Sequence, residues 1–437
     1  MISFNPLRTL PCAAGYGRGD VFVLFGELFG RGYANGLVEE ARKAGMTILG
    51  ITVGRRDASG ELRPLTEGER ADSEALLGGK IINIPLEAGF DMDTDEHGTS
   101  PVDQLKGVKS DAWGSVELDW KAVEQARKAG IERFTAHLTR VMGELDARIP
   151  DGCNVLFSHT MAGGIPRARI LMPVMNRVFK GQGERFTASE DFWKSSLGRL
   201  CEICFDEVTA NTFGHLIEAS GGIRERIERT GGRVAYTAYG YHGCEVLIND
   251  MYTWQTYTPY LQGWAKMRLE EVAVAAWEKG IRTTVFNCPE IQTNSSALFL
   301  GVELSLYPLL AALKREGDGP TAEEIRTACR ALLKEGVTLD EVVESANSYL
   351  SDPRLEEFRD FAAWPRHNSP EQADLMLTRA TALLDMNRSQ KEIVCAELSR
   401  AVFRAVGSLI FNTSWEPNAP VVWLNHDIVA RRIVTGA

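Results

Sequence analysis

The chain has 437 residues, of which 44% are hydrophobic, so it is long enough to bury a large core. Its 48 basic and 59 acidic residues give a net charge of −11, which argues against a nucleic-acid-binding protein because such proteins set cations against phosphates. The sequence shows no cationic and apolar leader and no apolar run of about 18 residues, so we expect a cytoplasmic protein without a membrane span.

Apolar runs typical of buried strands alternate with helical patterns along the first 317 residues. The predicted strands are, in chain order, 20–29, 46–53, 81–86, 154–158, 233–240 and 281–289. The predicted helices are 36–45, 123–149, 186–220 and 259–280. This alternation predicts an α/β fold, a Rossmann-like doubly wound parallel sheet with helices on both faces.

Two segments depart from this alternation. Residues 87–118 are acidic and aperiodic, and we interpret them as an inserted loop. Asp91, Asp93, Asp95 and Glu96 alternate there as in a calcium loop, but Glu96 stands where that turn needs glycine, so we expect a solvated loop and no metal. Residues 318–437 show helical patterns without convincing strands, so we predict a helical C-terminal extension to a Rossmann-type domain at 1–317.

A glycine-rich turn follows the first predicted strand. Gly26, Gly30 and Gly32 stand in the order G-x-x-x-G-x-G, with Arg31 between the last two, and the turn opens a helix. A phosphate can approach bare backbone at a helix N-terminus, where free N–H groups and the helix dipole favour negative charge. We therefore expect these four residues to hold a dinucleotide pyrophosphate. The alternative is an ordinary turn with three glycines.

Two arginines follow the second predicted strand, where a Rossmann fold meets the adenosine ribose. Arg55 and Arg56 can pair with a 2′-phosphate, whereas an acidic residue would favour a free 2′-hydroxyl, and Asp57 comes only after them. We therefore expect NADPH as the cofactor, with NADH as a possibility. The alternative is that both arginines are solvated.

These motifs resemble the short-chain dehydrogenase/reductase superfamily over residues 20–317. The glycine spacing is that of the superfamily, and the turn Thr160-Met-Ala-Gly163 resembles its turn beside the adenosine ribose, which implies a cofactor role for Ala162 and Gly163. The resemblance also assigns roles to later residues. Asn211 would support the proton relay, Lys266 would bind the ribose and assist catalysis, and the loop over the nicotinamide would contain Pro289, Ile291 and Thr293. Glu290 replaces the glycine that is usual in that loop.

The tyrosine spacing indicates a branch of that superfamily. Gln262 occupies the position four residues before Lys266, where the short form has its catalytic tyrosine. Eight residues separate Tyr257 from Lys266, which resembles the spacing in large enoyl-acyl carrier protein reductases and trans-2-enoyl-CoA reductases. Tyr239 resembles a second tyrosine of those enzymes. Tyr260 is the alternative acid, although Thr258 and Pro259 favour a helix start just after Tyr257.

The resemblance implies NADPH-dependent reduction of the 2,3 double bond of an enoyl thioester in fatty acid synthesis. The acyl group would be carried by coenzyme A or by an acyl carrier protein. Two alternatives remain open. One is a carbonyl reductase that uses Tyr257 or Tyr260 with Lys266. The other is a catalytically silent NADPH-binding regulator. The sequence does not indicate an oligomeric state.

Overall fold

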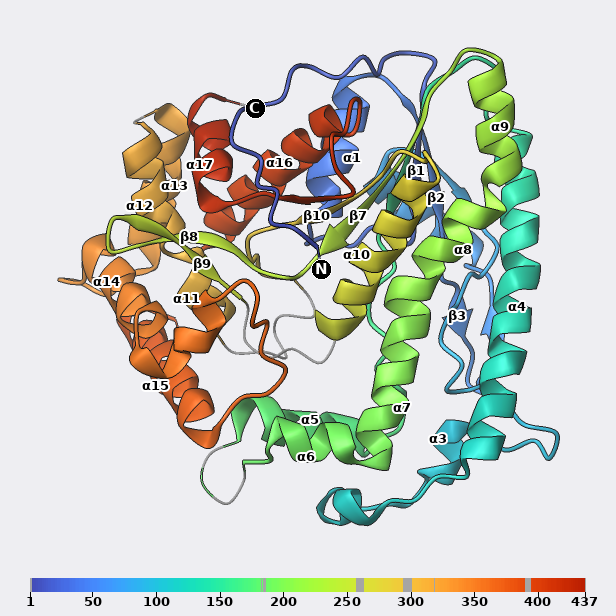
Figure 1. Cartoon of the computed structure of the whole chain (residues 1–437), viewed down its shortest axis with the longest axis horizontal. Coiled ribbons are helices and arrows are strands. Elements are labelled where there is room, and N and C mark those ends of the chain that lie inside the picture. Colours follow the sequence, from blue (N-terminus) through green and yellow to red (C-terminus); the bar gives the residue numbers. More distant parts are fainter. Residues whose placement is uncertain are drawn as a thin grey trace.

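A parallel sheet forms the centre of the molecule (Figure 1). The computed structural model describes residues 2–181, 183, 186–256, 263–293, 301–317, 319–389 and 394–436, and of residues 179, 180, 263 and 264 it describes the backbone alone. Within these ranges the sheet has seven strands in the order β5-β2-β1-β6-β7-β10-β11. Their bounds are β1 Val21–Phe25, β2 Thr47–Ile51, β5 Lys80–Ile82, β6 Val155–His159, β7 Val234–Gly240, β10 Thr283–Asn287 and β11 Val421–Trp423.

The strand order is that of a doubly wound sheet. The chain first builds outward from β1 to β2 and β5, then returns to the other side of β1 with β6 and continues to β11. In such sheets ligands bind at the carboxyl ends of the strands, where the order reverses. β1 reads VFVLF and is buried throughout, as expected of a parallel strand that is covered on both faces. All six predicted strands are present, and the Rossmann-like α/β prediction is confirmed.

Helices cover both faces of the sheet. Helices on the first face share a core with β1 and β7 side chains such as Leu24 and Tyr239, and they are α1 Ala34–Lys43, α2 Glu67–Leu77, α16 Ala396–Thr413 and α17 His426–Val434. Helices on the second face pack around Phe157 and Val285, and they are α4 Trp120–Asp146, α8 Thr212–Ala219, α9 Gly221–Arg229 and α10 Gly263–Glu278. None of the described helices combines the length and the apolar character that a membrane span needs.

The remaining elements lie around this three-layer centre. One group is α3 Pro101–Gln104, a 3₁₀ helix Ser110–Ser115, α5 Leu171–Lys180, α6 Ser189–Lys194, α7 Ser196–Phe205 and a π-helix Asp206–Asn211. The other is α11 Val302–Leu306, α12 Leu309–Glu316, α13 Pro320–Leu332, α14 Leu339–Leu350, a 3₁₀ helix Pro353–Arg359 and α15 Pro370–Met386. Two antiparallel hairpins join β3 Arg55–Arg56 to β4 Leu62–Arg63 and β8 Cys244–Ile248 to β9 Met251–Gln255.

The segment 87–118 differs from the expected solvated loop. It contains α3 and a 3₁₀ helix, and Asp91 is buried. Asp93 forms an ion pair with Arg133 of α4, with 2.7 Å between Nη2 and Oδ2. Arg167 donates its backbone N–H to Asp91 at 2.8 Å. The expected solvation is wrong at Asp91 and Asp93, because their partners come from residues 76 and 40 positions away in the chain, which local composition cannot reveal.

The C-terminal region adds a strand to the sheet, contrary to the prediction of helices alone. β11 pairs in parallel with β10, with Val285 opposite Val421. A strand of three residues is too short to show a periodicity in the sequence. The helix α16 lies beside α1 in Figure 1, and their backbones touch at Gly36, where an added Cβ atom would lie 1.9 Å from the carbonyl oxygen of Phe403.

Candidate cofactor and active site

The turn after β1 presents bare backbone at the start of α1. Gly26 has a φ of +133°, and an added Cβ atom would lie 2.4 Å from Oγ1 of Thr160, which follows β6. Gly32 has a φ of +149°. At Gly30 no atom lies within 4 Å of an added Cβ, so the backbone there is open. The residues predicted to hold a pyrophosphate therefore form a cradle that a side chain would fill, next to a helix N-terminus that favours an anion.

Glu27 places a carboxylate between the ends of β1 and β2. Its Oε1 atom accepts hydrogen bonds from the Thr52 hydroxyl at 2.5 Å, the Val53 N–H at 3.2 Å and Arg55 at 2.8 Å. Within the described residues, Arg55 is the one hydrogen-bond donor to its Oε2 atom, at 3.1 Å. Sequence reasoning missed Glu27, although its place directly after Gly26 was visible.

Both arginines expected at a 2′-phosphate are paired with carboxylates. Arg55 pairs with Glu27, and Arg56 pairs with Glu87 through Nε at 2.8 Å and through Nη2. The side chain of Arg56 is 14% exposed, and that of Arg55 is 37% exposed. Neither guanidinium stands as a free cation at the end of β2.

Lys266 lies on α10, close to the carboxyl ends of β6 and β7. Its Nζ atom donates a hydrogen bond of 2.6 Å to the backbone carbonyl of Tyr239. Burial lowers the pKa of Lys266 to about 8. His159, at the end of β6, is buried and bonds through Nε2 to Thr212 at 2.8 Å. Burial and the nearby Lys266 charge hold the pKa of His159 well below its usual value, so His159 is neutral at neutral pH.

A π-helix brings Asn211 into the same region. Asn211 is the last residue of the π-helix, which packs against α10, the helix of Lys266. The Thr209 hydroxyl of this turn bonds the backbone of Gly163 at 3.2 Å. π-Helical turns occur often at functional sites. The structure thus gathers Asn211, Lys266 and the turn that contains Ala162 and Gly163 at one edge of the sheet.

Tyr239 and the loop after β10 meet the start of α1. The Tyr239 ring stacks on Tyr33, with 5.6 Å between ring centroids, and burial raises the pKa of Tyr239. The Tyr33 hydroxyl donates to the carbonyl of Pro289. Ile291 is buried and Thr293 is half-buried. Lys266 contacts the backbone of Tyr239, and the Tyr239 ring faces the α1 side. The predicted acids Tyr257 and Tyr260 lie outside the described residues.

Glu290 is a further, half-buried carboxyl group at this edge. It accepts hydrogen bonds from the Tyr241 hydroxyl and, at 3.0 Å, from Ser305 of α11. Burial raises the pKa of Glu290 to about 8, so it is mostly protonated at neutral pH. In the sequence, Glu290 was noticeable because it replaces the glycine that is usual in this loop. Within the described ranges, no group of three His, Cys, Asp or Glu side chains could hold a metal.

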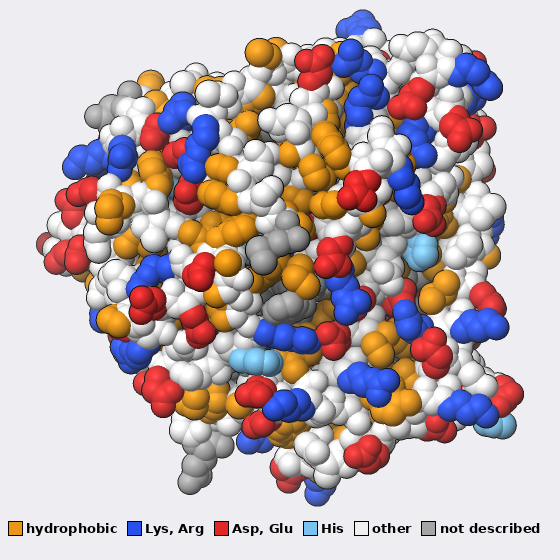
Figure 2. Space-filling model, in the orientation of Figure 1, with side chains coloured by type: hydrophobic (Ala, Val, Ile, Leu, Met, Phe, Trp, Pro, Cys, Tyr) orange, Lys and Arg blue, Asp and Glu red, His pale blue; other side chains and the backbone are white. Residues whose placement is uncertain are grey.

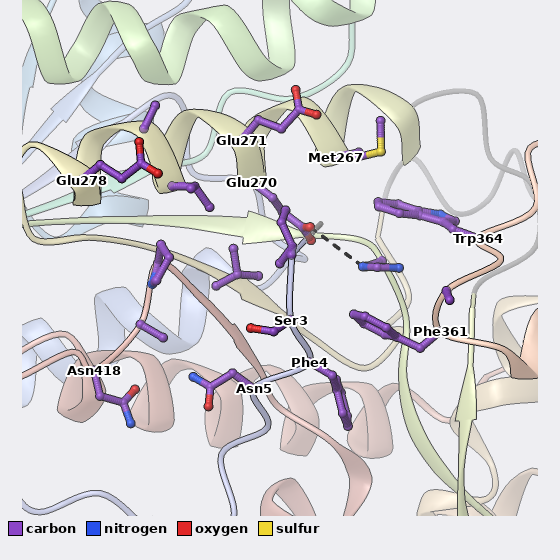
Figure 3. A pocket seen from close by; sticks show the side chains of 18 of the residues that line it. Ser3, Phe4, Asn5, Met267, Glu270, Glu271, Glu278, Phe361, Trp364 and Asn418 are labelled. Carbon is purple, nitrogen blue, oxygen red and sulfur yellow. Dashed lines mark ion pairs between the residues drawn. The ribbon is translucent and has the colours of Figure 1, made fainter.

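A cavity of about 840 Å³ lies along α10, and Met267, the neighbour of Lys266 in the chain, is among its lining residues (Figure 3). Phe361 and Trp364 form one wall of this cavity. Glu270 lies one turn after Lys266, and its Oε2 atom is 3.8 Å from Nδ1 of His242. Burial raises the pKa of Glu270 to about 8 and lowers that of His242 to about 3, so both are neutral at neutral pH. Figure 2 shows that hydrophobic side chains also gather in the middle of one face of the molecule.

Comparisons with a protein family and with solved structures give independent information on this chain. A family model described as enoyl-acyl carrier protein reductase FabMG matches residues 3–433. An apo structure of FabMG is 52% identical, covers 99% of this chain and 98% of its own, and superimposes with a TM-score of 0.95. An NADH-bound structure of FabMG is 43% identical, covers 99% of each chain and gives a TM-score of 0.79. No curated protein matches the chain.

Proposed function

The chain belongs to the FabMG family of enoyl-acyl carrier protein reductases and is an NAD(P)H-dependent oxidoreductase, and from this premise we propose how its residues divide the work. One observation carries the proposal. The bare turn from Gly26 to Gly32 and the half-buried Lys266 lie at the same edge of the sheet, where a dinucleotide would span from its pyrophosphate to its nicotinamide. Gly26, Gly30, Arg31 and Gly32 would hold the pyrophosphate.

The chemistry divides between cofactor and chain. When bound, a reduced nicotinamide supplies the hydride for the β-carbon of the enoyl thioester. Negative charge then develops on the thioester oxygen, and a phenol hydrogen-bonded to that oxygen stabilises it. We propose Tyr257 for this role, with Tyr260 as the alternative. Lys266 favours the ionised phenol through its positive charge and binds ribose hydroxyls, and Asn211 supports proton return. The α-carbon then receives a proton from tyrosine or water.

We propose NADH as the preferred cofactor, in place of the NADPH expected from the sequence. Arg55 and Arg56 are already paired with carboxylates, and Glu27 brings a negative charge to the end of β2. A carboxylate there accepts a hydrogen bond from a free 2′-hydroxyl and repels a 2′-phosphate. The NADH-bound FabMG relative supports the same choice. Ala162 and Gly163 would lie beside the adenosine ribose, and Pro289, Ile291 and Thr293 would cover the nicotinamide.

Three finer assignments belong to the proposal. The strand order and the order of the motifs support a divergent branch of the short-chain dehydrogenase/reductase superfamily, near the large enoyl reductases. The family description favours an acyl carrier protein over coenzyme A as the carrier of the acyl group. An enzyme of fatty acid synthesis with these features would work in the cytoplasm.

The test is turnover by the purified protein. Crotonyl and acetoacetyl thioesters, each on coenzyme A and on an acyl carrier protein, are mixed with NADH or NADPH, and the loss of reduced-nicotinamide absorbance is followed. We expect oxidation with the crotonyl substrates. Turnover with acetoacetyl substrates alone would establish the carbonyl reductase, and tight NADH binding without turnover would establish the silent regulator. Comparing kcat of Tyr257→Phe with that of Tyr260→Phe identifies the phenol.

A further inference from the structure

The Glu290 carboxyl group joins three segments that are distant in sequence. It belongs to the loop after β10, its Oε1 atom accepts from the Tyr241 hydroxyl just beyond β7, and its Oε2 atom accepts from the Ser305 hydroxyl of α11 at 3.0 Å. Ser305 is 6% exposed. The roles proposed above for Tyr257, Lys266 and Asn211 do not use this group. Its hydrogen bond to Ser305 ties this loop, which is expected over the nicotinamide, to the helix α11.

Besides the Ser305 hydroxyl, the titratable groups that face Glu290 within the described residues are phenols and one carboxyl group. Tyr241 comes from the end of β7, Tyr33 from the start of α1 and Tyr349 from α14, and Glu303 of α11 is 1% exposed beside it. The charge of Glu303 and burial both raise the pKa of Glu290, to about 8. A neutral carboxyl group accepts the two hydrogen bonds without a desolvated charge, whereas an ionised one would be repelled by Glu303.

We propose that Glu290, as a neutral carboxylic acid, is a positioning residue that holds α11 against the loop expected over the nicotinamide and so maintains the binding site for the acyl substrate. This inference rests on the function proposed above. Ionisation of Glu290 places a second negative charge beside Glu303, and the contact between α11 and the loop loosens. The acyl substrate then binds more weakly. The pyrophosphate turn at 26–32 keeps its affinity for the dinucleotide, because within the described residues it meets this loop through Arg31 and Gln292, at 3.5 Å, and not through the Glu290 carboxyl group.

The experiment separates substrate binding from cofactor binding as a function of pH. KM for a crotonyl thioester, kcat and the Kd of NADH are measured from about pH 6 to about pH 10 for the natural enzyme and for Glu290→Gln. In the natural enzyme we expect KM to rise by up to about tenfold per pH unit above about pH 8 relative to Glu290→Gln, while the Kd of NADH should follow the same profile in both proteins. Glu290→Gln stays neutral, so its KM should show only the pH dependence that the two proteins share.

The comparison with Glu290→Gln is necessary because Lys266 titrates in the same range, with a pKa of about 8. Lys266 is present in both proteins, so only the difference between their profiles reports Glu290. Glu344→Gln, which alters an exposed acid on α14, is the matched control and should reproduce the natural profile. Ser305→Ala should raise KM at pH 7 several-fold, because it removes one of the two hydrogen bonds.

Thermal unfolding gives a readout that does not need turnover. The pKa of Glu290 is raised on folding, from about 4.5 to about 8, so its contribution to stability is complete below about pH 4.5 and is lost as the pH rises through about 8. The Tm of the natural enzyme should therefore fall relative to that of Glu290→Gln over this window. An unchanged KM profile in Glu290→Gln, or a Kd for NADH that differs between the two proteins as much as KM does, overturns the proposal. An absence of enoyl turnover in the natural enzyme would instead reject the proposed function, and the Tm comparison would still test Glu290.

Discussion

The guanidinium of Arg55 forms an ion pair with the carboxylate of Glu27, with 2.8 Å between Nη1 and Oε1. The pair connects the carboxyl ends of β1 and β2, which border the adenosine site in a Rossmann fold. The carboxylate of Glu27 thus pairs with the Arg55 cation, which would otherwise attract a 2′-phosphate. The same carboxylate can accept a hydrogen bond from a ribose hydroxyl. The choice between the two dinucleotides depends on which member of this pair faces the ribose.

Glu27→Gln should shift cofactor preference towards NADPH. The change removes the negative charge and releases Arg55, so kcat/KM should fall for NADH and rise for NADPH, and their ratio should change by about tenfold or more, since a charge-assisted hydrogen bond contributes ~1.5–3 kcal/mol. Steady-state kinetics with both cofactors measures this. Glu61→Gln is the control, because Glu61 is an exposed acid in the β3–β4 hairpin that contains Arg55. An unaltered ratio in Glu27→Gln would show that Glu27 does not face the ribose.

Gly30→Leu should abolish dinucleotide binding without unfolding the protein. No atom lies within 4 Å of an added Cβ at Gly30, so the side chain is accommodated and occupies the space expected for the pyrophosphate. We expect Tm to stay near that of the natural protein and the Kd for NADH to rise by at least about tenfold, or ~1.4 kcal/mol, measured by fluorescence titration. Gly26→Ala is the contrasting variant, because φ at Gly26 is +133° and Thr160 is in the way, so its Tm should fall. Normal NADH affinity in Gly30→Leu would disprove the cradle.

Lys266→Met should lower kcat strongly and yet gain stability relative to the natural protein at neutral pH. Burial lowers the pKa of Lys266 from 10.5 to about 8, so the folded state disfavours the ammonium, which the unfolded chain carries below about pH 10.5. This cost disappears as the pH rises from about 8 to about 10.5, so the Tm advantage of the variant should shrink over that window. Lys279→Met, at the exposed end of α10, should show no such trend. A constant Tm difference between pH 7 and pH 10 would contradict the buried ammonium.

Gly36→Ala should destabilise the contact between α1 and α16. An added Cβ would lie 1.9 Å from the Phe403 carbonyl oxygen and 2.8 Å from its carbon, so the two helices must separate. We expect the free energy of unfolding to fall by ~1–3 kcal/mol, measured by denaturant titration. Gly143→Ala in α4 meets open space and should instead raise it by ~0.5–1 kcal/mol, as alanine favours a helix over glycine. Equal effects in the two variants would show that the helices adjust freely.

Local sequence patterns predicted the centre of the fold and the edge of the sheet that carries the site. Six strands and the turn from Gly26 to Gly32 follow from apolar runs and glycine spacing. Consecutive apolar residues indicate burial on both faces of a strand, and glycine allows the positive φ of Gly26 and Gly32. The pairing of Arg55 with Glu27 and of Arg56 with Glu87 was not predictable in this way. Each pair joins residues about 30 positions apart, and only the folded sheet brings them together.

Two other features were hidden for similar reasons. β11 is three residues long, and its place in the sheet depends on β10 and on backbone bonds from the N-terminal segment, where Leu7 donates to Trp423 at 2.9 Å. The link from Glu290 to Ser305 crosses from the end of a strand to α11, and a single glutamate at a glycine position indicated only a departure from the family pattern. Which tyrosine acts as the acid stays a prediction.

The position of β11 has a consequence for how the molecule is completed during synthesis. Residues 421–423 are synthesised after β10, so until they pair with it β10 is an outer strand with unsatisfied N–H and C=O groups along one side. Such a strand can recruit strands from other molecules. A nascent or truncated chain that stops short of Val421 would therefore be prone to aggregate, even with every residue of the nucleotide turn in place.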